Sequence, residues 1–288
     1  MSEPDFIATS RIAIIGLGLM GGSLALDLRD RCHSLLACDV DPRTLELAQQ
    51  QSLFAKLSRD PAEIVPEADV VILATPLNAI LALIKQLTDL HPGSPIILDL
   101  GSTKVNVVQT LESLPSRFDP LGGHPMCGKE RSGFENAEAG LFQGAAFAFT
   151  ALNRTSKEAR YFAEQMAFTI GAHALWIDPE THDQWSAATS HLPYLVASAL
   201  AGSTPAQSKP LVGSGFRSTT RIAATPARIM LDVLETNQEN IVEQMERFKE
   251  QLDHYQQLLI SGEYEVLKAA LDESANKQRN LAARQEHS

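Results

Sequence analysis

Short apolar runs alternate with longer amphipathic stretches over residues 11–178. Four of these runs, at residues 12–15, 35–40, 70–74 and 96–100, are each followed by a helical pattern, at residues 19–31, 42–51, 77–90 and 103–114. Continuous apolar strands are typical of burial on both faces, as in a parallel sheet covered by helices. The alternation therefore predicts an α/β fold with an N-terminal Rossmann-type, doubly wound parallel sheet.

The pattern changes after Pro179. Before it, runs at residues 121–126, 145–150 and 174–177 could add strands at one edge, with a helix at 156–170. Beyond it, residues 180–202 and 226–283 show helical patterns, 208–225 are loop-like and rich in Gly, Ser and Thr, and no strand is expected. We therefore expect two domains, a Rossmann-type domain over residues 11–178 and an all-α C-terminal domain over residues 179–283.

Apolar residues recur along the last helical region at intervals of seven, four and three. They are Leu234, Ile241, Met245, Phe248, Leu252, Tyr255 and Leu259. This spacing predicts an apolar stripe on one long helix, which either packs within the subunit or forms a helical interface between subunits. The length of the stripe favours the second interpretation, a homodimer formed through the C-terminal helices.

Composition narrows the possible partners. The chain has 288 residues, 44% hydrophobic and 20% charged, as in ordinary globular enzymes. No run approaches the roughly 18 apolar residues of a membrane helix, and the acidic N-terminus does not resemble a signal peptide, so we expect a cytoplasmic protein. The net charge of −11 disfavours nucleic acid and anionic membranes as partners, and a pocket for an acid would need its own cations.

A glycine motif follows the first strand directly. Gly16, Gly18 and Gly21 form GxGxxG at the start of a helix, where the glycines allow a tight turn, close approach of a pyrophosphate and helix–strand packing. Asp39 ends the second strand, where a carboxylate binds the ribose hydroxyls of NAD and repels the 2′-phosphate of NADP. We therefore expect an NAD site that also includes Leu19, Met20, Thr75, Pro76 and Ser102.

Two residues near Asp39 bear on this interpretation, Asp41 in its favour and Arg43 against it. Asp41 precedes a proline at the first position of helix 42–51, so Asp41 is a better N-cap for that helix than Asp39. Arg43 is the one nearby cation that would favour NADP.

Candidate catalytic residues follow two other strands. His124 lies between glycines and a proline just after a predicted strand, and a histidine is the natural base for an alcohol proton near neutral pH. Ser102 ends another strand of the same sheet and could hydrogen-bond a substrate hydroxyl or orient His124, or it could cap the next helix.

Cations for an anionic substrate are found further along. Arg217 and Arg221 are four residues apart and share a face if that stretch is helical. With His191 upstream they could bind carboxylates, although two solvated arginines and a buried histidine are the simpler interpretation.

Five segments together resemble one family. GLGLMGGS, DLGSTK, GGHPMCGKERSG, HDQWSAATSHLP and GSGFRSTTR occur in the order and approximate spacing of the prephenate/arogenate dehydrogenases of tyrosine biosynthesis. The resemblance extends from about residue 11 to beyond residue 250, and the GGHPM and SHLP segments are much more specific than the glycine motif.

The resemblance implies an NAD(P)-dependent oxidative decarboxylation of a cyclohexadienol. His124 matches the family's catalytic histidine and would accept the ring-hydroxyl proton, while Ser102 matches a serine that hydrogen-bonds near that hydroxyl. Arg221 matches the arginine that binds the substrate carboxylate, Glu130 an acid that tunes the site by ionic contacts, and Arg217 a basic position.

One departure concerns the substrate. Prephenate-using members often read SHLPH, whereas this chain has Tyr194 at the second histidine. Loss of a potential cation beside the substrate side chain slightly favours arogenate over prephenate. Tyrosine is a candidate feedback inhibitor.

Three alternatives stay open. Hydroxyisobutyrate-type 3-hydroxyacid dehydrogenases also begin GLGLMG, although their catalytic lysine has no match here. A non-catalytic NAD-sensing protein would not need Ser102, His124 and Arg221. His182, Asp183 and His191 could suggest a metal site, but their spacing matches no common ligand motif, so we expect no metal.

Overall fold

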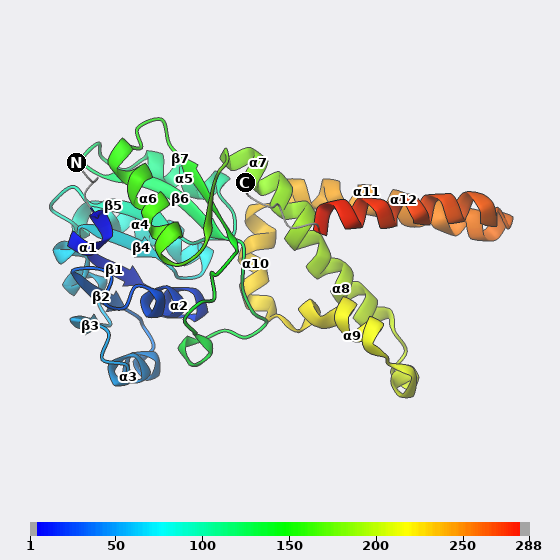
Figure 1. Ribbon diagram of the computed structural model, residues 1–288, viewed down its shortest axis with the longest axis horizontal. Helices are drawn as coiled ribbons and strands as arrows, with labels where there is room; N and C mark the ends of the chain where they lie inside the picture. Colours follow the sequence, from blue (N-terminus) through cyan, green and yellow to red (C-terminus); the bar gives the residue numbers. More distant parts are fainter. Residues whose placement is uncertain (1–4, 283–288) are drawn as a thin grey trace. The chain divides into compact units, whose positions relative to one another are not determined.

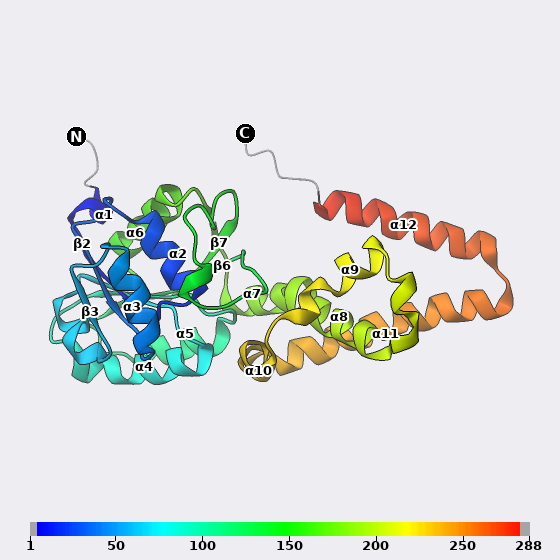
Figure 2. The same ribbon diagram turned by 90° about the horizontal axis from the view of Figure 1, so that it is seen from below.

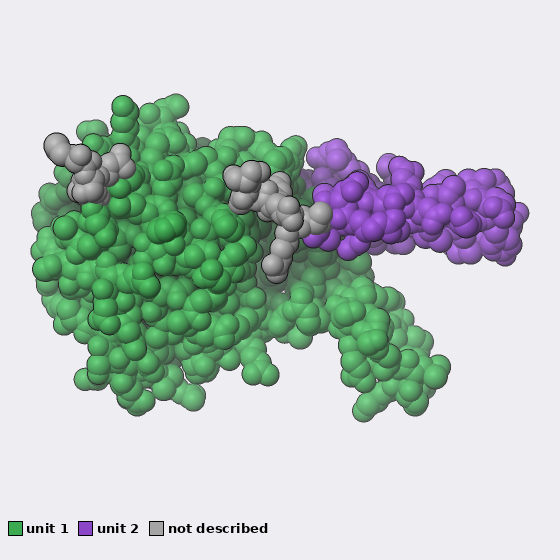
Figure 3. Space-filling view, in the orientation of Figure 1, with its two compact units in different colours: residues 1–238 green, residues 239–288 purple. Residues whose placement is uncertain are grey.

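The computed structural model describes residues 5–282, and the chain forms two compact units, residues 1–238 and 239–288 (Figure 3). The first unit contains an eight-stranded sheet in the order β3-β2-β1-β4-β5-β6-β7-β8 (Figures 1 and 2). Its strands are β1 (Arg11–Ile15), β2 (Ser34–Cys38), β3 (Lys56–Ser58), β4 (Val70–Leu73), β5 (Ile96–Asp99), β6 (Asp119–Pro125), β7 (Ala146–Ala151) and β8 (His173–Trp176).

The sheet is mostly parallel, which confirms the predicted doubly wound fold. Only the β6–β7 pair is antiparallel, so β7 and β8 run opposite to the other six strands. The three predicted edge strands are therefore present. β3 was not predicted, because three half-buried residues carry no recognisable apolar run.

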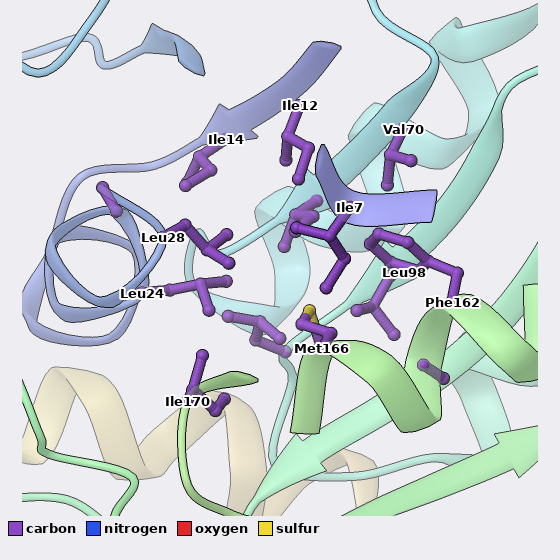
Figure 4. Close-up of a cluster of buried hydrophobic side chains, with 14 of the residues drawn as sticks. Ile7, Ile12, Ile14, Leu24, Leu28, Val70, Leu98, Phe162, Met166 and Ile170 are labelled. Atoms are coloured by element: carbon purple, nitrogen blue, oxygen red, sulfur yellow. The ribbon is translucent and has the colours of Figure 1, made fainter. Parts of the chain in front are cut away.

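Helices cover both faces of the sheet. Alternate residues of β1 enter two separate cores: Ile12 and Ile14 pack in one, and Ala13 and Ile15 in the other. Figure 4 shows part of the first core. Its helices are α1 (Phe6–Thr9), α2 (Leu19–Asp27), α3 (Pro42–Gln50) and α6 (Lys157–Thr169), and the second core is covered by α4 (Leu77–Leu90) and α5 (Val105–Glu112).

Residues 179–236 are helical in short pieces. α7 (Pro179–Ser186) continues through a π-helical turn (Ala187–His191) into α8 (Leu192–Ser203). The stretch expected to be a loop forms helical turns instead, at Ala206–Leu211, α9 (Ser214–Thr220) and Arg221–Ala224, and α10 (Ala227–Thr236) follows. As expected, no strand occurs among the described residues after Pro179.

The predicted single helix from residue 226 is in fact three helices. α10 ends at Thr236, and the C-cap residue Asn237 that follows has a non-helical backbone (φ −126°, ψ 26°). α11 (Gln238–Ser261) and α12 (Tyr264–Ala282) follow, joined at Gly262, which has a φ of 73°. Leu234 therefore lies on α10, not with the other stripe residues on α11.

The expected domain boundary at residues 178/179 stays a prediction, since the compact units divide at 238/239. The expected end of the C-terminal domain, at residue 283, lies outside the described residues. Among the described residues, no helix is both long and apolar enough to cross a bilayer.

Candidate active site

The glycine motif forms a tight β1–α2 turn. Gly16 has a φ of 99°, and a Cβ there would lie 2.8 Å from the backbone of Ala74. A Cβ on Gly21 would lie 2.0 Å from the Gly16 carbonyl oxygen, whereas one on Gly18 would meet no atom within 4 Å. Packing thus requires two of the glycines, and Gly18 faces open space.

This open space lies at the start of α2. Gly18 is the N-cap residue and brings no side chain that could accept from the first N–H groups of the helix, those of Leu19 and Met20. A helix N-terminus with this geometry suits a phosphate group, because its N–H groups and dipole both favour an anion. The residues present therefore fit a dinucleotide.

Asp39 lies beside this turn, half-buried after β2. Its Oδ2 accepts from the Leu17 N–H at 2.7 Å and its Oδ1 from the Asp41 N–H at 2.9 Å. A carboxylate has about four acceptor positions, so these bonds orient Asp39 and leave room for ribose hydroxyls. Asp41 caps α3 by accepting from the Arg43 N–H at 3.0 Å, as expected.

Two other residues border the nucleotide region. Arg59, which sequence reasoning missed because it follows β3, donates to the Val40 carbonyl at 3.2 Å and adds a second cation near Asp39. Thr75 follows β4, and its Cγ2 would lie 2.8 Å from a Cβ on Gly16. The next residue, Pro76, is exposed and precedes α4.

His124 lies inside β6, one residue before its end, and not after the strand as expected, because β6 continues through His124 in its pairing with β7. Its side chain is hydrogen-bonded to α7. Its Nδ1 is 3.0 Å from Nε2 of His182, whose Nδ1 is 2.7 Å from Oδ1 of Asp183. His182 and Asp183 are 3% and 1% exposed. The structure therefore connects the candidate base to a buried carboxylate through a second histidine.

Asp183 also binds the start of α5. It accepts from the Lys104 N–H at 2.7 Å and from the Val105 N–H at 2.9 Å. The alternative role considered for Ser102, capping this helix, is wrong: α5 begins at Val105 with Lys104 as cap residue, and Asp183 takes its first N–H groups. Ser102 lies half-buried three residues after β5.

A buried ion pair supports this edge of the sheet. Lys104 Nζ pairs with Asp99 at the end of β5 and donates to the Gly123 carbonyl at 2.7 Å. Asp99 also accepts from the Gly101 and Gly123 N–H groups, at 2.7 and 3.2 Å. Burial raises the pKa of Asp99 and lowers the pKa of Lys104, and their mutual attraction opposes both shifts. The pair fixes the end of β6, and with it the backbone before His124.

The surroundings keep the His124 imidazole neutral. Its pKa lies well below the usual value, first because of burial and then because His182, Lys104 and His191 disfavour a further positive charge. A neutral imidazole can accept a proton, as a general base must.

His191 belongs to the same cluster. It is 1% exposed, and its Nδ1 lies 3.1 Å from Nδ2 of Asn237, which also donates to the Asp183 carbonyl at 2.7 Å. Among the described residues no group hydrogen-bonds Nε2 of His191. Because the amide nitrogen is a donor, Nδ1 of His191 accepts and its proton sits on Nε2.

The remaining predicted substrate residues are more exposed. Arg221, directly after α9, forms an ion pair with Glu130, and its expected role as the ligand of the substrate carboxylate stays a prediction. Arg217 is exposed one helical turn earlier and donates to the Val212 carbonyl at 3.4 Å. Tyr194 is half-buried on α8, three residues after His191 and hence on the same side of the helix.

Around His124, sequence reasoning missed the roles of four residues: His182, Asp183, Lys104 and Asn237. The sequence did give one signal for His182 and Asp183: they are adjacent titratable residues near a predicted helix start, a pattern that could also suggest metal ligands. Within residues 5–282, however, no group of His, Cys, Asp or Glu side chains is arranged to hold a metal ion.

Both parts of the chain match models of one protein family. Residues 24–175 match the nucleotide-binding domain of prephenate dehydrogenase, and residues 178–273 match the prephenate dehydrogenase dimerization domain. A prephenate dehydrogenase from Bacillus subtilis is 32% identical over 254 residues, which cover 84% of this chain and 68% of that protein. A cyclohexadienyl dehydrogenase from Zymomonas mobilis is 29% identical over 286 residues, covering 96% of this chain and 97% of that protein.

Solved structures of prephenate and arogenate dehydrogenases have the same fold as this chain. Prephenate dehydrogenase from A. aeolicus, in complex with hydroxyphenyl propionate and NAD+, has a TM-score of 0.86 at 28% identity and covers 94% of this chain and 98% of its own. Synechocystis arogenate dehydrogenase has a TM-score of 0.80 at 27% identity, covering 94% of this chain and 100% of its own. A 3-hydroxyisobutyrate dehydrogenase from Mycobacterium tuberculosis shares only the fold, with a TM-score of 0.52 at 16% identity.

Proposed function

Because this chain belongs to the prephenate dehydrogenase family and is an NAD(P)-dependent oxidoreductase of tyrosine biosynthesis, we propose that it oxidatively decarboxylates arogenate, prephenate or both, with His124 as the base. The reaction removes the ring-hydroxyl proton and a hydride from the same carbon. The ring then loses CO2, and the electron pair of the broken C–C bond makes it an aromatic phenolate, which takes up a proton to become the phenol. The observation that carries the proposal is that His124, near the end of a strand of the nucleotide-binding sheet, is held on one nitrogen by His182, and that its surroundings lower its pKa.

The cofactor is proposed to be NAD in preference to NADP. When bound, it supplies the hydride acceptor. Gly16, Gly18 and Gly21 with the start of α2 would hold the pyrophosphate, and Asp39 would accept from the ribose hydroxyls and repel a 2′-phosphate. Leu19, Met20, Thr75, Pro76 and Ser102 complete the proposed cofactor contacts. Arg43 and Arg59 are the two cations that weaken this discrimination.

The substrate acid is proposed to bind guanidinium groups. Arg221 is the primary carboxylate ligand, since the substrate can take the place that Glu130 occupies in the ion pair, and Arg217 adds positive charge. Ser102 would hydrogen-bond the ring hydroxyl beside His124. These local cations offset the repulsion between an anionic substrate and a chain with a net charge of −11.

The substrate side chain is proposed to lie near His191 and Tyr194. The Nε2–H of His191 is a buried donor with no acceptor among the described residues, so it suits a carboxylate or carbonyl oxygen. Tyr194 places a phenol at the position where a cation would favour the keto acid of prephenate, which supports arogenate as the better substrate. Tyrosine, which carries the same side chain on an aromatic ring, is proposed as a competing ligand of this site.

The enzyme is also proposed to be a homodimer, with residues 179–283 as the substrate-binding and dimerisation domain. The match of residues 178–273 to a dimerization domain supports this.

Initial rates with each substrate and each cofactor test the function, with His124→Asn as the paired variant. We expect NAD-dependent turnover of at least one cyclohexadienol, faster with arogenate. His124→Asn should lower kcat by about 10²–10⁴, as for loss of a general base, while NAD binding measured by calorimetry stays unchanged. Inhibition by added tyrosine is read in the same assay. No turnover with any of the four combinations, or full activity of the variant, contradicts the proposal.

A further inference from the structure

The buried carboxylate of Asp183 receives more hydrogen bonds than a cap needs. Its oxygens accept from the Lys104 and Val105 N–H groups at 2.7 and 2.9 Å, and Nδ1 of His182 lies 2.7 Å from Oδ1. An ionised carboxylate only accepts, and the N-terminus of α5 favours its negative charge. The His182 Nδ1 must therefore carry a proton and donate it.

This assignment determines the other nitrogen of His182. With the ring neutral and its proton on Nδ1, Nε2 of His182 has a lone pair and accepts. Nδ1 of His124 lies 3.0 Å away. Two lone pairs cannot face each other at this distance, so the His124 proton is on Nδ1 and Nε2 of His124 is unprotonated.

We propose that Asp183, through His182, sets the tautomer of His124 and so presents Nε2 as the base. His182 and Asp183 are positioning residues, since both act through His124. When Nε2 of His124 takes the substrate hydroxyl proton, the Nδ1–H donates more strongly to His182, and His182 to Asp183. The positive charge formed on His124 is then stabilised by a carboxylate two hydrogen bonds away.

Among the described residues no other nearby group favours a positive charge on His124, so the protonated ring depends on the hydrogen bonds through His182 to Asp183. The charged or titratable groups that influence it are Lys104, His182 and His191, and the first causes of its low pKa disfavour the protonated ring. Asp183 is the acid connected to it by hydrogen bonds. The proposal rests on the proposed role of His124 as base.

Asp183→Asn tests the proposal. An amide can donate to Nδ1 of His182, which moves the His182 proton to Nε2 and, in turn, the His124 proton from Nδ1 to Nε2. Two successive tautomer changes would block the base. We expect kcat to fall by about 10²–10⁴, with the KM of the substrate and the Kd of NAD nearly unchanged.

Nitrogen-15 NMR of histidine-labelled enzyme reads the tautomers directly and needs no turnover. Signals are assigned by their loss in His124→Asn and His182→Leu. We expect protonated Nδ1 and unprotonated Nε2 on His124 in the wild type, and the reverse in Asp183→Asn. A wild-type His124 protonated on Nε2 overturns the proposal, whatever the kinetics show.

A second pair of variants tests the proposal even if Asp183→Asn does not fold. His182→Leu removes the acceptor of His124 and should lower kcat, whereas His182→Gln retains an acceptor oxygen and should restore part of it. His91→Gln is the matched control: His91 is a buried histidine on the Ala68 carbonyl (2.8 Å) and the Gly93 N–H (2.9 Å), so its loss should affect stability only.

The outcomes separate this proposal from the function itself. An inactive wild type with the expected tautomer contradicts the dehydrogenase function and leaves the tautomer assignment supported. An active wild type whose His182→Leu variant turns over as fast as the wild type contradicts the positioning role alone.

Discussion

His124, which is half-buried, and the buried His191 belong to one hydrogen-bonded cluster connected through His182, Asp183 and Asn237. Burial is the first cause of the low pKa of both imidazoles, and it lowers the pKa of His191 to about 4. Protonation would remove the base from His124 and add an acceptor-less N–H to His191. The acid limb of kcat/KM should consequently lie below pH 6.5, the usual histidine value.

The low pKa of His191 makes stability depend on pH. An unfolded histidine binds its proton below about pH 6.5, whereas folded His191 binds one only below about pH 4. Between these values the unfolded chain binds more protons, so the free energy of unfolding falls as the pH is lowered. The gap corresponds to about 3 kcal/mol lost by pH 4.

Urea unfolding of the wild type and of His191→Asn between pH 7 and pH 4 measures this effect. The variant starts from a lower stability, because Asn237 loses a partner, but it should lose about 3 kcal/mol less across this range. Parallel pH dependences for the two proteins would mean that His191 is not held neutral by folding.

At the scale of elements, the β1–α2 turn needs glycine at residues 16 and 21 because a Cβ there would clash, whereas glycine at residue 18 leaves space beside the turn. In Gly21→Ala the new Cβ would be 2.0 Å from the Gly16 carbonyl oxygen, so helix and strand must separate. We expect a loss of about 3 kcal/mol in unfolding free energy, at the upper end for overpacking. In Gly18→Ala the Cβ meets no atom within 4 Å, so stability should stay within about 1 kcal/mol of the wild type.

For NAD binding we expect the reverse order: Gly18→Ala should be affected more than Gly21→Ala. The methyl group of Gly18→Ala would occupy the space proposed for the pyrophosphate and raise the Kd of NAD, measured by calorimetry at a temperature where both variants are folded. Unchanged NAD affinity in Gly18→Ala would place the phosphates elsewhere, and wild-type stability in Gly21→Ala would contradict the packing argument.

Elements defined by local patterns were predictable, and those defined by distant contacts were not. The strands and helices of the Rossmann-type sheet have apolar periodicities that follow from burial on one or both faces. α5 begins two residues later than predicted, because its ends are set by remote groups. Asp183 takes its first N–H groups, and Arg154 donates to the carbonyls of Leu111 and Leu114 at its end.

The candidate site divides in the same way. His124, Ser102 and the glycines lie at strand ends, where ligands of such sheets bind, so local sequence was enough to select them. The link from His124 to Asp183 joins residues about sixty positions apart, and no periodicity reports it. Asn237 was hidden for a related reason: the apolar spacing continues across it, while its side chain bonds Asp183 and His191.

At the scale of the whole molecule, α11 has more exposed apolar surface than a helix in contact only with water would favour. Ile241 and Leu258 are buried, but Leu252 and Leu259 are 49% and 55% exposed, and Met245 shares their face. Contiguous exposed apolar side chains usually mark an interface. Together with the match to a dimerization domain, this supports the second interpretation of the stripe, contact between subunits.

Substituting Leu252 and Leu259 together by Glu tests that interpretation. Two carboxylates in an apolar interface would be desolvated without partners, a cost of several kcal/mol that a dimer could not absorb. We expect multi-angle light scattering to show a dimer for the wild type and a monomer for the double variant. Gln257→Glu, exposed on the opposite side of α11, is the control for added charge and should remain dimeric. Because His124, Arg221 and the nucleotide turn all lie in residues 1–238, the monomer should still bind NAD. A double variant that stays dimeric would show that the subunits meet elsewhere, and the exposed stripe on α11 would then need another partner.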